Sequence, residues 1–151
     1  ESWQDQAAFA EHDKAAQTRQ FREELKAVHR GPFDQRINSA FSVDPRAGTA
    51  GPKAINVVTH VDVPGARRED AEVLLKRLAE ASRKDAGNVR YDVYQQADPR
   101  ANHFTVFAAW DSERALDAYG DTPHWQQFRE ALGPMLGALY DERIYLAGAA
   151  R

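Results

Sequence analysis

The chain matches itself when its sequence is shifted by 107 residues, and this repeat limits the possible folds more than any other feature. Residues 3–37 lie over residues 110–144 without a gap, and ten of the 35 aligned positions are identical. The identical pairs are Trp3/Trp110, Ala8/Ala115, Gln20/Gln127, Phe21/Phe128, Arg22/Arg129, Glu23/Glu130, Leu25/Leu132, Asp34/Asp141, Arg36/Arg143 and Ile37/Ile144. Identity spread over the whole segment predicts two copies of one structural unit.

The two copies differ in what precedes them. Residues 54–107 stand before the second copy, whereas almost nothing stands before the first. We therefore predict the C-terminal half of a first domain (1–37), a linker rich in Gly, Pro, Ala and Ser (38–53), and a complete domain (54–148). A half domain would expose an apolar face and an unpaired strand edge. Either the native chain extends before Glu1 or another chain supplies the missing half, and we favour the first explanation.

The composition predicts a globular protein that binds neither nucleic acid nor membranes. Hydrophobic residues make up 42% of the chain, the net charge is −3 and the pI is about 6.0. No apolar run approaches the roughly 20 residues that span a membrane. The absence of cysteine excludes disulfides, thiolate metal sites and a cysteine nucleophile. We expect a cytoplasmic protein, with export left open because a cleaved signal would leave the same sequence.

The hydrophobic periodicity of 54–148 predicts an α+β domain. Ile55 and Val57 share one face of the first strand, while Asn56 and His60 share the other. We predict strands at 54–63, 88–96, 103–110 and 142–148, one helix after the PGARRED turn, and two more at 112–119 and 122–136. The order β-α-β-β-α-β is the ferredoxin-like unit. Its helices cover one face of the sheet. We expect the bare face to pack on a second sheet, in a homodimer or between tandem domains.

Three stretches of this domain resemble the antibiotic biosynthesis monooxygenase family, including its quinol monooxygenases. They are VVTHVDVPG, GNVRYDVYQ and AWDSERALDAYGDTPHWQQF, and the last follows the family pattern of Trp, a short helix, His and then Thr-Pro-His. The likeness covers about 54–148, and 1–37 match the back half of the same domain. The resemblance implies a dimeric α/β barrel with a mostly apolar pocket in each sheet. Some members oxidise quinols or polycyclic phenols with O₂ and no metal or flavin, close relatives degrade haem, and many have no known reaction.

Each copy keeps only one of the two histidines that the family pattern contains. In the complete copy, Tyr119 stands where the first histidine is expected, and His124 is the Thr-Pro-His histidine. In the first copy, His12 fits the first position, but Gln17 replaces the second histidine. Either the copies have specialised or one pocket is inactive.

Oxidation by O₂ without a cofactor requires an electron-rich substrate that acts as its own reductant. The protein must remove a phenolic proton, exclude water and stabilise the resulting anion and peroxide. We predict as catalytic residues Trp110, His124, Tyr119, His60 and Asn56, and as substrate-binding residues Tyr94, Tyr91, Trp3 and His12. The two histidines of the catalytic set are the candidate bases, since imidazole titrates near neutral pH. We expect a small aromatic substrate with O₂, and no metal or other cofactor.

Several of these residues also have a simpler structural explanation. Core packing would account for Trp110 and for Tyr91, which shares its strand face with Val89 and Val93. A place near a helix start would account for His124. Tyr119 in place of a histidine argues against a standard quinol oxidase.

Three functions stay open at this point. The leading hypothesis is a cofactor-independent oxygenase for a quinol-like aromatic. The second is a non-catalytic ligand-binding or stress-associated module, which the incomplete Trp–His pattern favours. The third is a haem-degrading relative, whose axial histidine would have to stand where Tyr119 is found, so that only His12 in the first copy supports it.

Overall fold

The computed structural model describes residues 1–31, 35–45, 48 and 50–146. The chain forms two compact units, Glu1–Gln35 and Arg36–Arg151, which are described separately. The predictions for Phe33 and Asp34, for part of the linker and for the last two residues of the final strand lie outside the described residues.

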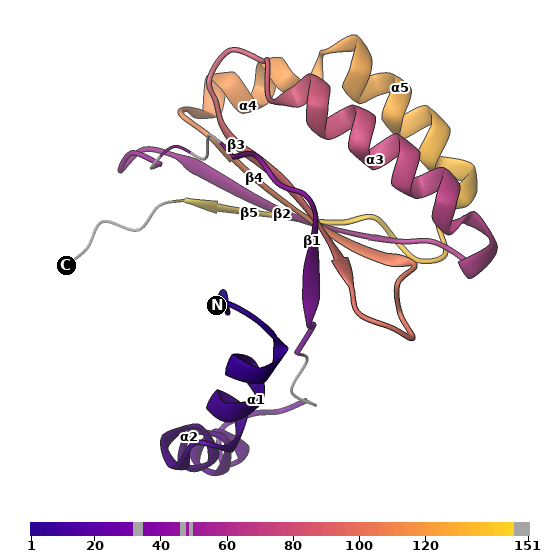
Figure 1. Cartoon of the computed structure of the whole chain (residues 1–151). Helices are drawn as coiled ribbons and strands as arrows, with labels where there is room; N and C mark the ends of the chain where they lie inside the picture. The colour runs from indigo at the N-terminus through magenta and orange to yellow at the C-terminus, as the bar shows by residue number, and fades with distance from the viewer. Residues whose placement is uncertain (32–34, 46–47, 49, 147–151) are drawn as a thin grey trace. The chain divides into compact units, whose positions relative to one another are not determined.

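The larger unit is built on one five-stranded antiparallel sheet (Figure 1). Its strands are β1 (Asn38–Ser42), β2 (Ile55–Asp62), β3 (Asn88–Gln96), β4 (His103–Trp110) and β5 (Asp141–Leu146). The sheet order is β1-β3-β4-β2-β5. The last four strands have the ferredoxin-like arrangement, which confirms the predicted α+β fold. The described strands form an open sheet, with β1 and β5 at its edges, and do not close into a barrel.

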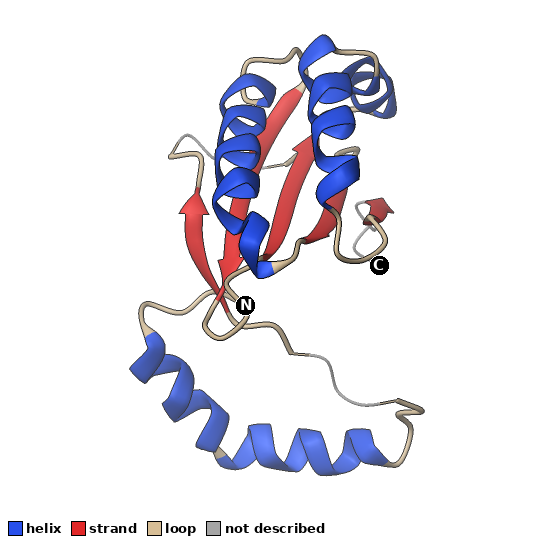
Figure 2. Cartoon of the chain, turned by 90° about the vertical axis from the view of Figure 1, so that its right-hand side faces the viewer, coloured by secondary structure: helices blue, strands red, loops and turns tan. Residues whose placement is uncertain are grey.

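Three helices cover one face of this sheet: α3 (Arg68–Ser82), α4 (Glu113–Gly120) and α5 (Pro123–Leu132). Figure 2 shows α3 and α5 side by side over the strands. Short 3₁₀ turns, η1 (Gly65–Arg67) and η2 (Gly133–Met135), precede α3 and follow α5. The core lies between the helices and the sheet, and its burial is the main favourable contribution to folding. No helix in the described ranges is long and apolar enough to cross a membrane.

The alternation of β2 decides which side chains enter this core. Ile55, Val57 and Val61 are buried, while the residues between them are only partly buried. Successive side chains of a strand point to opposite faces, so the sheet has one face under the helices and one without helix cover. We call these the helix face and the open face.

A glycine fixes the turn between α3 and β3. Gly87 has φ +80°, a conformation that side chains with a Cβ rarely adopt. A Cβ there would lie 2.5 Å from the Cβ of Ala115 and 2.7 Å from Oδ1 of Asp111. The turn is therefore packed against the start of α4, close to the site described below.

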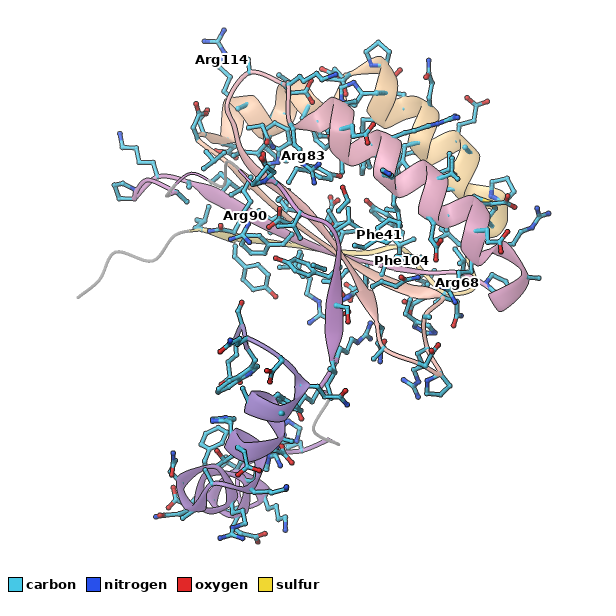
Figure 3. The ribbon with its side chains drawn as sticks, in the orientation of Figure 1. Phe41, Arg68, Arg83, Arg90, Phe104 and Arg114 are labelled. Atoms are coloured by element: carbon cyan, nitrogen blue, oxygen red, sulfur yellow. The ribbon has the colours of Figure 1, made fainter. Side chains whose placement is uncertain are left out.

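The predicted linker differs from the structure at its beginning, because Asn38–Ser42 form β1. This strand pairs with β3, with Ala40 opposite Tyr94. Arg83, at the end of α3, donates from Nε to the carbonyl of Tyr91 at 3.0 Å and from Nη2 to the carbonyl of Ser42 at 2.7 Å. Phe41 packs edge-on against Phe104, with ring centroids 5.9 Å apart (Figure 3). These contacts join β1 to the sheet. The strand was not predicted, because five residues beside a Gly/Pro-rich stretch are too short to show a hydrophobic period.

The smaller unit contains two helices, α1 (Gln6–Lys14) and α2 (Ala16–Lys26). Each starts 107 residues before its counterpart, since α4 begins at Glu113 and α5 at Pro123. The N-caps are also repeated. Asp5 accepts from the N–H of Ala8 at 2.8 Å, and Ser112 accepts from the N–H of Ala115 at 3.3 Å.

Candidate functional site

The predicted site residues of the complete domain lie on opposite faces of the sheet. Ile55 and Trp110 are directly paired, so Trp110 shares the helix face with Ile55. Thr105 pairs with both His60 and Tyr94 and places those two side chains on the open face. The structure groups Trp110, Tyr119, Tyr91 and His124 on the helix face, and Asn56, His60 and Tyr94 on the open face. A single ligand on one face cannot contact both groups.

The helix-face group is a cluster of aromatic rings between β3, β4, α4 and α5. The ring of Tyr119 lies 4.6 Å from that of Trp110 and 5.1 Å from that of Trp125. Its hydroxyl is 3.0 Å from the hydroxyl of Tyr91 and 3.4 Å from Ser82 Oγ, which itself donates to the carbonyl of Leu78. Tyr119 therefore lies at the centre of the cluster and belongs to a buried chain of hydroxyl groups.

Burial keeps these phenols protonated. Desolvation raises the pKa of Tyr91 well above its usual value, and the nearby Tyr119 raises it further. Desolvation also raises the pKa of Tyr119, against the opposing effect of its hydrogen bonds with Ser82 and Tyr91. Both hydroxyls are thus hydrogen-bond donors at neutral pH and not bases.

Trp110 contributes a donor that has no acceptor. Its side chain is 0% exposed, and its indole Nε1 has no hydrogen-bond partner within the described part of the chain. A buried polar group without a partner costs about 1–3 kcal/mol, so such groups are rare and need an explanation. Its position beside Tyr119 makes it the unused donor of the aromatic cluster.

His124 lies at the edge of this cluster with a carboxylate partner. Its ring centroid is 5.9 Å from that of Tyr119. Its Nε2 lies 2.9 Å from Oδ2 of Asp85 and 3.2 Å from Oγ1 of Thr122. The side chains of His124 and Asp85 are 27% and 19% exposed, so this pair has access to water while the rings of Trp110, Tyr119 and Tyr91 are buried.

The outer side of the cluster is formed by Trp125, Tyr140 and Arg129. The Trp125 ring stacks on Phe128, and the Arg129 guanidinium lies 3.8 Å from the centroid of the Tyr140 ring. Desolvation, followed by the charge of Glu142, raises the pKa of Tyr140. Trp125 and Tyr140 are only partly buried, so they are the cluster's rings with solvent access.

Sequence reasoning missed Ser82, Asp85 and Tyr140 as members of this site. Ser82 and Asp85 lie 37 and 39 residues from their partners Tyr119 and His124. Nothing in the local pattern links such positions. Tyr140 follows η2 in the sequence. Its alignment with Phe33 in the repeat was the one sequence feature that could have indicated a role for this aromatic ring.

The open face carries a separate polar network. Asp92 is fully buried and accepts from Arg90, from the hydroxyl of Tyr94 at 3.2 Å and from the N–H of Asp44 at 2.8 Å. Arg90 also lies over the Phe107 ring, and Figure 3 labels it among the strands.

His60 lies on this open face 3.2 Å from Thr105 Oγ1. Desolvation lowers its pKa, with a further lowering from the charge of Arg36. Asn56 lies on the same face, between Ala109 and Tyr145.

The two candidates of the smaller unit are close together. The rings of Trp3 and His12 are 4.4 Å apart, and His12 Nε2 lies 3.4 Å from Thr18 Oγ1. Nothing in this unit matches the buried hydroxyl chain of the complete domain, as far as the described residues show. Those residues also contain no group of three His, Cys, Asp or Glu side chains arranged to hold a metal ion.

The chain is similar to one protein family and to curated bacterial proteins. A family model described as antibiotic biosynthesis monooxygenase matches residues 54–131. An uncharacterized protein from Synechocystis is 28% identical over 91 residues, which cover 60% of this chain and 61% of that protein. "Putative monooxygenase YcnE" from Bacillus subtilis is 28% identical over 69 residues, or 46% of this chain and 72% of that protein. This chain spans less than two thirds of the Synechocystis protein.

Some solved structures match about two thirds of the chain, and others match nearly all of it. Rv0793 from Mycobacterium tuberculosis (23% identity, TM-score 0.59) matches 65% of this chain and 97% of its own. A conserved protein from Methanosarcina mazei is 26% identical with a TM-score of 0.60, and the match covers 64% of this chain and 95% of that protein. A structure from Fusobacterium nucleatum, described as a putative monooxygenase (13%, 0.74), covers 98% of this chain and 70% of its own. At 13% identity the last likeness concerns the fold alone.

Proposed function

We propose an oxygenase function for this chain, which belongs to the antibiotic biosynthesis monooxygenase family. The family match and the name of the Bacillus relative support a monooxygenase-like activity. The substrate class that we propose is an electron-rich aromatic, a hydroquinone or an anthrone, which reduces O₂ directly.

The observation that carries this proposal is the buried, unpaired indole N–H of Trp110. A buried donor in a dry site stabilises negative charge as it develops. Aromatic rings surround this donor, and such rings stack favourably on a flat aromatic ligand. The hydroxyls of Tyr119 and Tyr91 are hydrogen-bonded to each other, so one of the two can also donate to the same anion.

The proposed reaction begins with proton transfer to His124. The proton comes from the hydroxyl of a hydroquinone or from the enol form of an anthrone. The anion passes one electron to O₂, and the resulting radical and superoxide combine as a carbon-bound peroxide. This peroxide anion accepts a hydrogen bond from Trp110 and takes the proton back from His124. Loss of water, with the remaining hydrogen on the same carbon, leaves a carbonyl. For an anthrone the CH₂ carbon supplies all four electrons, so one O₂ gives one quinone and one water.

Access to Trp110 requires a movement of the aromatic cluster. Trp110 has no exposed surface, so a ligand that accepts its N–H must displace a neighbouring ring. Trp125 in α5 and Tyr140 lie on the solvent side of the cluster. The short turn η2 follows α5 directly and lies between these two residues in the sequence. We assign entry to this side, because Trp125 and Tyr140 are only partly buried.

The open-face residues Asn56, His60 and Tyr94 have a different role in this proposal. They cannot reach a ligand at Trp110, because the sheet lies between them. We assign them to a face that packs on a second sheet, either in a homodimer or in a tandem domain. The buried Arg90–Asp92–Tyr94 network already fixes part of this face without a partner.

A tandem arrangement is the form of pairing that we favour. The matching starts and N-caps of the helices in the two units support it. So does the Fusobacterium structure, since its fold matches 98% of this chain, with both units included.

Oxygen uptake tests the proposed function. Chelator-treated protein is added to a panel of reduced quinones and anthrones in an oxygen electrode. We expect uptake above the autoxidation rate, insensitive to chelator, with one O₂ consumed for each anthrone converted to quinone. Uptake no faster than autoxidation across the panel, from folded protein, contradicts the proposal.

A second candidate is a ligand-binding module without catalysis. The incomplete Trp–His pattern favours it, with Tyr119 where the first histidine is expected. This module would bind the oxidised quinones, seen as quenching of tryptophan fluorescence, yet consume no O₂. A haem-degrading function is disfavoured, because the raised pKa of Tyr119 opposes the phenolate that would bind iron there. A Soret shift on adding haem would restore that function.

A further inference from the structure

The side chains of Asp85 and His124 form a pair that is better buried than an ordinary surface ion pair. Asp85 lies in the turn between α3 and β3, and His124 lies in the first turn of α5. Their atoms Oδ2 and Nε2 are 2.9 Å apart, and both side chains are more than two-thirds buried. The contact joins two elements that border the aromatic cluster on different sides.

The backbone holds Asp85 in place from both directions. Its N–H donates to the carbonyl of Ser82 at 3.2 Å, and its carbonyl accepts from the N–H of Asn88 at 3.1 Å. The next fixed point is Gly87, whose carbonyl accepts from the N–H of Asp111 at 2.9 Å. The carboxylate is therefore presented from a rigid turn, and little entropy is lost when it pairs with the histidine.

The hydrogen bonds around His124 determine which ring nitrogen carries the hydrogen. A carboxylate can only accept, so the Asp85 contact requires an N–H at Nε2. Thr122 also contacts Nε2, but its hydroxyl hydrogen is donated to the carbonyl of Tyr119 at 2.7 Å. Thr122 can therefore only accept from the ring as well. Both neighbours select the neutral tautomer with hydrogen on Nε2, which leaves the lone pair on Nδ1.

We propose that Asp85 is a positioning residue, which fixes the ring orientation and tautomer of His124 and so presents Nδ1 as the base. The role of Nδ1 as the base rests on the proposed function, whereas the effect of Asp85 on the orientation and tautomer of His124 does not. In other enzymes a carboxylate behind a histidine has the same effect on tautomer and orientation. Asp85 itself need not touch the substrate.

The test is a long-range ¹H–¹⁵N spectrum of the histidine rings in the whole chain, above pH 7.5, with His124 assigned by a His124→Gln variant. We expect His124 to be hydrogenated at Nε2, and Asp85→Asn to give a mixture of tautomers, because an amide can either donate or accept. Asp62→Asn is the matched control. Asp62 pairs with His103 at 2.9 Å on the open face, so this variant should change His103 and leave His124 as it was.

Kinetics supply the second readout. Asp85→Asn should lower kcat about 10- to 100-fold, by analogy with partners that orient a catalytic ligand, with little change in KM. Asp85→Glu should recover part of the loss. His124 hydrogenated at Nδ1, or a tautomer unaffected by Asp85→Asn, overturns the proposal whatever the activity. A correct tautomer in a protein that consumes no O₂ instead rejects the proposed function and keeps Asp85 as the residue that orients His124.

Discussion

The two copies of the repeat place the same side chains in opposite environments. Trp110 is 0% exposed and Phe128 is 4% exposed, whereas their counterparts Trp3 and Phe21 are 41% and 57% exposed. The helices themselves start at matching positions and have matching N-caps. In the described part of the chain, the helices of the second copy belong to the unit that contains strands β2, β3 and β4, and those of the first copy belong to a separate unit.

This comparison separates what local sequence determines from what tertiary packing determines. Caps and helix starts depend on a few neighbouring residues and are the same in both copies. Burial, the hydroxyl chain and the unpaired indole depend on the sheet and occur in the second. The candidate site is therefore a property of the larger unit, and matched substitutions 107 residues apart can test this.

The largest expected effect is on stability, from Phe128→Ala compared with Phe21→Ala. Removing the buried ring leaves a cavity between α5 and the sheet and should lower the free energy of unfolding by about 3–5 kcal/mol. Removing the exposed ring should cost about 0.5 kcal/mol or less. Urea unfolding followed by circular dichroism measures both. Equal losses would mean that Phe21 is buried in solution by a partner.

The next effect is on turnover, from Trp110→Phe compared with Trp3→Phe. The first variant keeps an aromatic ring but removes the indole N–H, so kcat should fall on the order of 100-fold. The second variant should leave kcat unchanged. Thermal melting of each variant serves as the control for folding. Unchanged turnover in folded Trp110→Phe would remove this N–H from the mechanism.

The helix caps should respond alike in the two copies. Ser112→Ala and Asp5→Ala each remove a side-chain acceptor at an N-cap, at a cost of about 1 kcal/mol to the helix concerned. Hydrogen exchange of the first-turn amides of α4 and α1 reports this locally. A loss confined to α4 would show that α1 does not form an ordered helix in solution.

The smallest effect concerns pH and the open face. Desolvation lowers the pKa of His60 in the folded chain, so the unfolded chain binds more protons between that pKa and the usual value of about 6.5. The stability contribution of neutral His60 is complete above pH 6.5 and is lost as the pH falls below it. His60→Gln should flatten this part of the stability profile. An unchanged profile would show that another group causes it.

The sequence predicted much of the fold, because alternation and helical periodicity are local signals. The faces of β2 and β3 followed directly from residues such as Val57 and Tyr91. The site was harder to predict, since the face of Trp110 depends on its pairing with Ile55 across the sheet. The Asp85–His124 pair and strand β1 depend on contacts between distant segments, and no local pattern contains them.

The most direct test of the central claim is a ¹H–¹⁵N spectrum of the indole groups, recorded while an anthraquinone product is added. The chain has three tryptophans, so three indole N–H signals are expected. If the Trp110 N–H is the donor of the site, its signal should move downfield on binding, while the signal of Trp3 stays in place. A ligand that binds, or a substrate that turns over, without moving the Trp110 signal would contradict the account.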